Sequence, residues 1–105
     1  MNRNEVTMLI NAGFNRPSMY KRSVWNKVTL IMEFLTNQNL LIRMDGEIKY
    51  GTSDGHVPTE GDIQKWTDAY LSSPFYSHLD ELKQLSKQLH LPLTSGELLR
   101  QYMNI

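Results

Sequence analysis

One segment of this sequence, residues 24–36, has the pattern of a helix that is apolar on more than one side. Along one face, apolar residues recur at intervals of four, three and four positions: Val24, Val28, Ile31 and Leu35. Further apolar side chains widen that face: Trp25, Leu30, Met32 and Phe34. Such a helix is stable in water only when other elements cover it. We therefore expect residues 24–36 to form the central helix of the core, capped by Ser18 or Ser23 and ending near residues 37–39.

The size and composition of the chain limit what can surround this helix. The chain has 105 residues, of which 40% are apolar and none is cysteine. A chain of this length has room for one core, so a single domain over residues 1–105 is expected. The absence of cysteine excludes disulfides, thiolate metal ligands and thiol nucleophiles. Glu33 interrupts the longest apolar run, which falls short of the roughly 18 to 20 residues that span a bilayer, so no membrane segment is expected.

Helices are predicted on both sides of the central segment. The first covers about residues 5–12, with Asn4 as its N-cap and Gly13 as a left-handed stop. Another begins after Thr59, where Asp62 makes an imperfect capping box because aspartate replaces the usual glutamate or glutamine. The inner face of this helix is predicted to comprise Ile63, Trp66 and Tyr70.

Two more helices are predicted in the last third of the chain. Ser73 and Pro74 suit the cap and the first turn of one helix. Its apolar stripe consists of Phe75, Leu79, Leu82, Leu85 and Leu89. Pro92 ends that pattern, and Thr94 with Glu97 forms a capping box for a last helix.

Residues 40–50 predict a β-hairpin, because two runs of strand composition flank Asp45 and Gly46. A three-residue loop at 44–46, with Gly46 left-handed, separates apolar from charged side chains better than a two-residue loop does. In that register the facing pairs are Leu40–Tyr50, Leu41–Lys49, Ile42–Ile48 and Arg43–Glu47. The predicted fold is therefore mainly helical α+β, with about five helices and one hairpin at residues 40–50.

The net charge of zero conceals an uneven distribution along the chain. Residues 1–50 carry seven Lys or Arg and four Asp or Glu, whereas residues 51–105 carry four and seven, so the halves have charges of +3 and −3. The basic cluster consists of Arg16, Lys21, Arg22 and Lys27, and the acidic one of Asp54, Glu60, Asp62 and Asp68. Each cluster is a candidate partner surface. The alternative is that the two neutralise each other within the fold or stay solvated apart.

The sequence contains no catalytic or metal-binding pattern. No two histidines have the one-turn spacing at which imidazoles share a metal ion: His56, His78 and His90. Asp54 and His56 are close enough for an acid–base pair, although two polar residues in a turn are usually only solvated. Asp80 and Glu81 are adjacent, so their carboxylates diverge by about 100° on a helix. We expect neither an enzyme nor a bound cofactor or metal.

A helix followed directly by a hairpin, at residues 24–50, resembles the recognition helix and wing of winged-helix DNA-binding proteins. The resemblance covers about a third of the chain. It implies that phosphate groups are contacted by Lys21, Arg22, Lys27, Arg43 and Lys49. The apolar surface of residues 24–36 does not suit a helix lying open in a groove, and the acidic second half repels phosphates. Nucleic acid is therefore disfavoured as a partner.

Residues 53–61, with the sequence SDGHVPTEG, lead into a helix that contains Trp66 and Tyr70. This stretch of about twenty residues resembles small bacterial immunity proteins, which neutralise toxins of contact-dependent growth inhibition. The resemblance implies a cytoplasmic protein that covers the active site of a toxin, commonly a nuclease. Carboxylates suit that role because they mimic nucleic-acid phosphates and steer association with a basic partner.

The predicted function is accordingly non-enzymatic toxin neutralisation by binding a basic protein, and a winged-helix regulator is the alternative. The predicted partner-binding residues are Asp54, Glu60, Asp62, Asp68, Tyr76, Asp80 and Glu81. Tyr76 is included as an aromatic anchor, because such residues dominate interface energies. Trp66 and Tyr70 are assigned to the core instead, since they share the helical spacing of Ile63.

Overall fold

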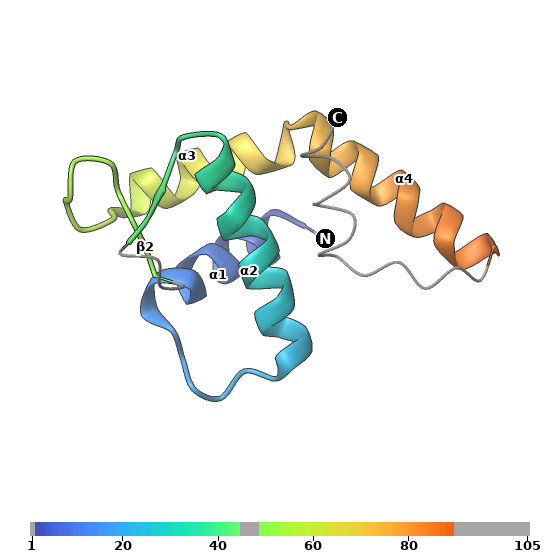
Figure 1. Ribbon diagram of the computed structural model, residues 1–105, viewed down its shortest axis with the longest axis horizontal. Coiled ribbons are helices and arrows are strands. Elements are labelled where there is room, and N and C mark those ends of the chain that lie inside the picture. Colours follow the sequence, from blue (N-terminus) through green and yellow to red (C-terminus); the bar gives the residue numbers. More distant parts are fainter. Residues whose placement is uncertain (1, 45–48, 90–105) are drawn as a thin grey trace.

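In the computed structural model the described residues are 2–44 and 49–89, and they form four helices and a two-stranded antiparallel sheet (Figure 1). In chain order the elements are α1 (Arg3–Asn15), α2 (Arg22–Asn37), β1 (Ile42–Arg43), β2 (Tyr50–Gly51), α3 (Glu60–Leu71) and α4 (Pro74–Leu89). The mainly helical α+β class is confirmed. Four helices are present in the described residues instead of about five, and the helix predicted after Thr94 lies outside them.

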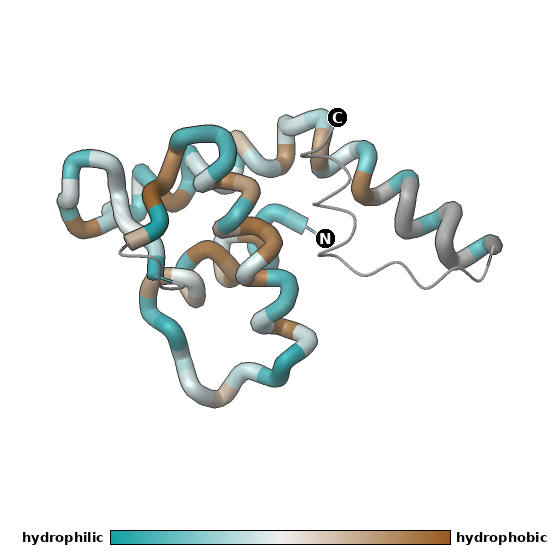
Figure 2. The backbone as a smooth tube through the Cα atoms, in the orientation of Figure 1, coloured by the Kyte–Doolittle hydropathy of each residue, from teal (hydrophilic) through white to brown (hydrophobic). Residues whose placement is uncertain are grey.

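The core confirms the central place predicted for the helix at residues 24–36. The buried side chains of α2 are Val28, Leu30, Ile31, Met32, Phe34 and Leu35. Helices α1 and α3 both contact α2, so α2 is covered on more than one side. In Figure 2 the hydrophobic stretches of these helices face the region where they cross. Within the part of the chain that the structure describes, no helix has the length and hydropathy needed to cross a membrane.

The ends of α1 differ from the prediction. Asn2, not Asn4, is the N-cap, and its side chain accepts a hydrogen bond of 2.9 Å from the backbone of Glu5. The left-handed residue that ends the helix is Arg16, with φ of 51°, whereas Gly13 lies inside the helix and is buried. The prediction that Gly13 ends the helix in a left-handed conformation was therefore wrong, and glycine is needed at this position for a different reason. A Cβ atom there would lie 2.6 Å from the side chain of Met32, so glycine permits the close approach of α1 and α2.

The start of α2 also departs from the prediction, since neither Ser18 nor Ser23 is its cap. Lys21 occupies the N-cap position, and no side chain accepts a hydrogen bond there. Ser23 lies within the helix, one residue past its first. The helix ends at Asn37, within the predicted range of 37–39. Lys21 and Arg22 place positive charge at the N-terminus of α2, which is the positive end of the helix dipole, and this lowers local stability.

The hairpin is present, but the predicted register was wrong. Ile42 faces Gly51 instead of Ile48, Arg43 faces Tyr50, and the Met44 nitrogen donates a hydrogen bond of 2.9 Å to the Lys49 oxygen. Contacts with α2 explain the shift, because Tyr50 is buried and its hydroxyl donates to Glu33 at 2.8 Å. The contact between β2 and α2 thus outweighs the separation of apolar and charged side chains onto opposite faces of the hairpin. Gly46 and the rest of the predicted turn lie outside the described residues.

The starts of α3 and α4 follow the predicted caps. Thr59 accepts a hydrogen bond of 3.2 Å from the Asp62 nitrogen, and the Asp62 carboxylate accepts one of 3.0 Å from the Thr59 nitrogen, so the capping box is complete. Ser73 accepts a hydrogen bond of 3.1 Å from the Tyr76 nitrogen. The start of helix α4 packs on the core through Phe75 and Leu79, and the rest of the helix extends away from the other helices (Figure 1), so that the molecule measures 44 Å along its longest axis. The later members of its predicted stripe have side chains outside the described set: Leu82, Leu85 and Leu89.

One buried hydroxyl gives a test of how the core is packed. The ring of Tyr70 meets Phe34 edge-on at 5.6 Å, and its hydroxyl is buried without a hydrogen-bond partner among the described residues. Burial raises the pKa of Tyr70 well above its ordinary range. Removing an unsatisfied buried hydroxyl is favourable, so Tyr70→Phe is expected to raise the free energy of unfolding by about 1 kcal/mol.

The control for this prediction is Tyr50, which is also buried. Tyr50 donates its hydroxyl to Glu33, so Tyr50→Phe is expected to lower the free energy of unfolding by about 1 kcal/mol. Urea denaturation of both variants measures the two effects. Equal destabilisation by the two substitutions would show that the Tyr70 hydroxyl does have a partner.

Candidate interaction surface

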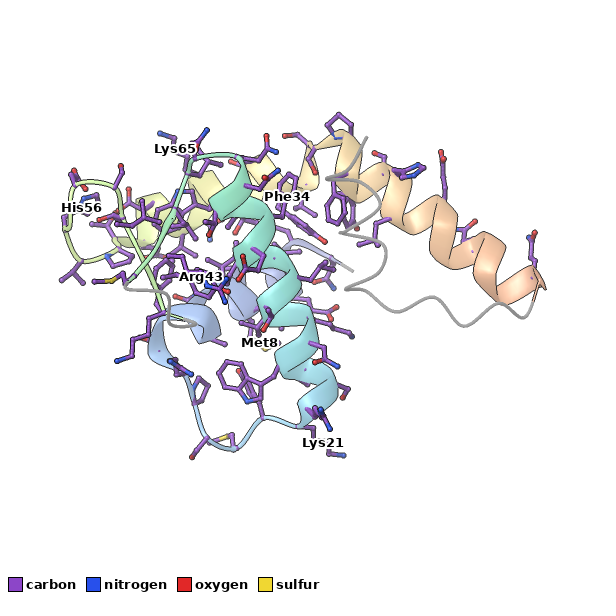
Figure 3. The ribbon with its side chains drawn as sticks, viewed as in Figure 1. Met8, Lys21, Phe34, Arg43, His56 and Lys65 are labelled. Carbon is purple, nitrogen blue, oxygen red and sulfur yellow. The ribbon has the colours of Figure 1, made fainter. Side chains whose placement is uncertain are left out.

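The loop between β2 and α3, residues 52–59, is folded back on itself by local hydrogen bonds. Thr52 is buried and its hydroxyl donates to the His56 carbonyl oxygen at 2.8 Å. The Gly55 nitrogen donates to the Thr52 oxygen at 3.1 Å, and Gly55 has φ of 79°, a conformation that favours glycine. These contacts hold His56 at the far end of the loop, where Figure 3 shows it at the edge of the molecule.

His56 lies between two carboxylates, one from its own loop and one from α3. Its Nδ1 atom contacts Asp54, and its Nε2 atom lies 2.8 Å from Asp62 Oδ2. The hydrogen bonds with Asp62 and then Asp54 raise the pKa of His56 above its ordinary value. The hydrogen bond with His56 lowers the pKa of Asp54, while the Thr59 backbone, followed by His56, lowers that of Asp62.

This arrangement suits an ion cluster better than a catalytic pair. Both ring nitrogens of His56 already face carboxylate oxygens, so neither is open to a proton from a substrate. The described residues also include no group of three or more histidine or acidic side chains placed to hold a metal ion. With two carboxylates around one histidine, the cluster carries an excess of negative charge.

Three of the predicted site residues lie together at this loop and at the start of α3. We call these residues, Asp54, Glu60 and Asp62, the acidic surface. Glu60 is exposed in the first turn of α3 and forms no ion pair within residues 2–44 and 49–89. Val57 lies on the same loop with 83% of its surface exposed, although it was not among the predicted residues.

Asp68, by contrast, is neutralised within the fold. Its carboxylate forms an ion pair with Arg3, whose other guanidinium nitrogen donates to Gln64 at 2.6 Å. This pair joins the basic first half of the chain to the acidic second half. Two further ion pairs, each at 3.6 Å, lie within the first half: Lys27–Glu5 and Arg43–Glu33. The two halves therefore neutralise each other only in part.

The remaining predicted residues belong to α4. Tyr76 is half-buried and its ring lies 5.3 Å from that of Tyr70, so it covers the core. Glu81 is exposed, and the side chain of Asp80 lies outside the described set. Because α4 points away from the loop at 52–59, these residues do not share a surface with the acidic surface (Figure 1).

Sequence reasoning missed two hollows that adjoin along α1. The first, of about 280 Å³, is lined by Thr7, Asn11, Pro58, Thr59, Glu60, Ile63 and Gln64. The second, of about 380 Å³, is lined by Asn4, Thr7, Met8, Asn11, Ala12, Asn15, Pro17 and Tyr20. A signal was present, because uncharged polar residues recur along one face of α1: Asn4, Thr7, Asn11 and Asn15. That pattern does not predict that α3 forms the other side of the first hollow.

The basic end of α2 is a separate surface. Lys21 and Arg22 are exposed at the start of α2 and make no ion pair among the described residues. Figure 3 shows Lys21 and His56 at well-separated edges of the molecule. Met19 lies beside these cations in the preceding loop, with 83% of its surface exposed.

The acidic surface with its adjoining hollow and the basic end of α2 are thus two distinct surfaces of opposite charge. Either suits a macromolecular partner of the opposite sign. No protein-family model, no curated protein and no solved structure matches the chain.

Proposed function

We propose that this chain is a cytoplasmic, non-enzymatic binding protein that neutralises a basic protein, such as a toxin with nuclease activity. It does so by covering the active or substrate-binding surface of that protein. The observation that carries the proposal is the acidic surface, in which Asp54 and Asp62 share one histidine, His56, and Glu60 lies exposed at the start of α3. The resemblance of residues 53–61 to immunity proteins supports the same role.

The hollow next to the acidic surface fits the side chain of an arginine or lysine from the partner. Pro58 and Ile63 provide apolar walls for its methylene groups, and Glu60 provides a carboxylate at the rim. Arginine is enriched among residues that dominate interface energies, particularly where it is desolvated in a pocket. A hollow of about 280 Å³ leaves room for one such side chain.

The acidic surface is tested by reversing one of its charges. Glu60→Lys is the best choice because Glu60 is exposed and forms no ion pair with the described residues, so the cost in stability should be limited to about 1 kcal/mol from the altered charge at the start of α3. The partner to use is the product of the reading frame beside the one that encodes this chain, since immunity proteins are encoded next to their toxins. Glu60→Lys is expected to weaken binding of that protein by about tenfold or more and to reduce protection of growing cells.

Glu81→Lys is the matched control, because it makes the same charge change on α4, away from the loop at 52–59. It is expected to bind and protect like the unaltered protein. Unchanged binding by Glu60→Lys, with loss of binding by Glu81→Lys, would move the interface to α4. Absence of any binding to the neighbouring product would count against toxin neutralisation.

The second candidate function is DNA binding as a winged-helix regulator, and the basic end of α2 favours it. Lys21 and Arg22 are exposed cations without an ion pair in the described residues. The other residues that the winged-helix resemblance assigns to phosphates have protein contacts: Lys27 lies 3.6 Å from Glu5, and Arg43 lies 3.6 Å from Glu33. The backbone oxygen of Lys49 accepts a hydrogen bond from the Met44 nitrogen.

Duplex DNA binding at increasing salt separates the two functions. A regulator should lose affinity steeply with salt, and the combined Lys21→Ala and Arg22→Ala change should reduce the slope of log affinity against log salt by about 2. Fluorescence anisotropy with labelled duplex measures this slope. No binding at low salt would exclude the regulator and leave the acidic surface as the proposed site.

A further inference from the structure

We infer that Asp54, His56 and Asp62 form a proton-operated latch that fastens the loop at 52–59 to the start of α3. The ring of His56 bridges the two elements, because Nδ1 contacts Asp54 in the loop and Nε2 lies 2.8 Å from Asp62 in α3. Asp62 is itself fixed by the capping box with Thr59, so one end of the bridge is anchored to the helix backbone.

The chemistry of the three groups requires a proton on each ring nitrogen. Ionised carboxylates only accept hydrogen bonds, and a neutral imidazole has a single N–H. With His56 neutral, one ring nitrogen would therefore present a lone pair to a carboxylate oxygen. Both contacts can be hydrogen bonds only when the ring is the imidazolium ion. Loss of one proton from His56 accordingly breaks one side of the bridge.

The charged groups that face the ring are Asp54 from its own loop and Asp62 from α3. They raise the pKa of His56 above 6.5, so its stabilising contribution is complete below 6.5 and is lost as the pH rises through the raised pKa. The two aspartates have pKa values lowered from 3.8. Their contribution is therefore present above 3.8 and is lost as the pH falls through the lowered values. The latch is therefore closed between the lowered pKa values of the two aspartates and the raised pKa of His56.

Opening of the latch changes the acidic surface in two ways. The cluster of two carboxylates and one imidazolium has a net charge of −1, and deprotonation of His56 makes it −2. The loop that is freed carries Val57, and it also carries Pro58, which lines the hollow beside Glu60. A rise in pH should therefore strengthen attraction of a basic partner. This consequence rests on the function proposed above, whereas the latch itself does not.

The latch is tested on the full chain by NMR, following the ring signals of His56 and the amide signals of the loop as the pH changes. The titration midpoint of His56 should be highest in the unaltered protein and lower in both Asp62→Asn and Asp54→Asn. It should be lowest in a free peptide of residues 53–59. Loop amides should exchange with solvent severalfold faster above the midpoint, after correction for the intrinsic pH dependence.

Asp62→Asn keeps an oxygen that can accept from Thr59, so the cap survives while the charge on the ring partner is removed. If Asp62→Asn does not fold, Asp54→Asn gives an independent measurement of the His56 titration midpoint. Equal midpoints in the folded chain and the free peptide would overturn the latch. So would midpoints unmoved by either substitution. A confirmed titration with no capture of the neighbouring gene product at any pH would count against the proposed function and leave the latch intact.

Discussion

Replacing Phe34 by alanine is expected to lower the free energy of unfolding by about 3 to 5 kcal/mol. Phe34 is 2% exposed and joins three helices in the core. Its ring stacks on Phe75 of α4 at 5.0 Å, with 15° between the planes, and meets Tyr70 of α3 edge-on at 5.6 Å. Alanine removes both aromatic contacts and leaves a cavity that three helices cannot all close.

Such a loss is large against the total stability of roughly 5 to 15 kcal/mol that small domains have. Urea denaturation followed by circular dichroism measures it, and a shorter apolar replacement, Phe34→Leu, should cost less because it leaves a smaller cavity. Met19→Ala provides the control, since Met19 is 83% exposed and its loss should change stability by no more than about 0.5 kcal/mol. A loss below about 1 kcal/mol for Phe34→Ala would mean that α4 does not cover α2 as the structure shows.

The features that could be predicted are those determined by residues close together in the sequence. The capping box of Thr59 and Asp62 was predicted because both partners are three residues apart. The cap of α4 by Ser73 was predicted for the same reason. The burial of α2 was predictable because its apolar residues outnumber the positions of a single exposed face.

The features that could not be predicted depend on contacts between distant parts of the chain. The hairpin register follows from the hydrogen bond between Tyr50 and Glu33 in α2, which facial sorting within the hairpin does not include. Gly13 has the local pattern of a helix stop, but Met32 determines its role. Glycine statistics favour the helix end, and only the packing of α1 on α2 shows why this one is internal.

The candidate site divides along the same line. Asp54, Glu60 and Asp62 are near one another in the chain, so a loop that leads directly into a helix keeps them together. Asp68 was predicted to face a partner, yet it pairs with Arg3, which lies 65 residues earlier in the chain. The hollow beside Glu60 was not predictable either, because Thr7 and Asn11 come from α1 and approach α3 only in the folded chain.

Gly13→Ala is expected to lower the free energy of unfolding by about 1 to 3 kcal/mol, which is the cost of overpacking a core. Helix propensity alone favours alanine over glycine by about 1 kcal/mol, so the sign of the change tests packing against propensity. A Cβ atom at this position would lie 2.6 Å from Met32 Cε and 2.7 Å from its Cγ. Met32 is completely buried, so in a close-packed core its side chain can shift only by displacing its neighbours.

A double-mutant cycle separates this clash from any other effect of the added methyl group. Met32→Ala alone should cost about 2 to 5 kcal/mol, and the double variant should cost less than the two single changes together by about 1 kcal/mol or more. Gly61→Ala is the control, because a Cβ atom there would lie 3.7 Å from the Thr59 hydroxyl, an ordinary contact, and should raise stability through helix propensity. Additive effects in the cycle would show that Met32 is not what excludes a side chain at Gly13. Coupling would establish that the close approach of α1 and α2 at this point depends on the absence of a side chain at Gly13.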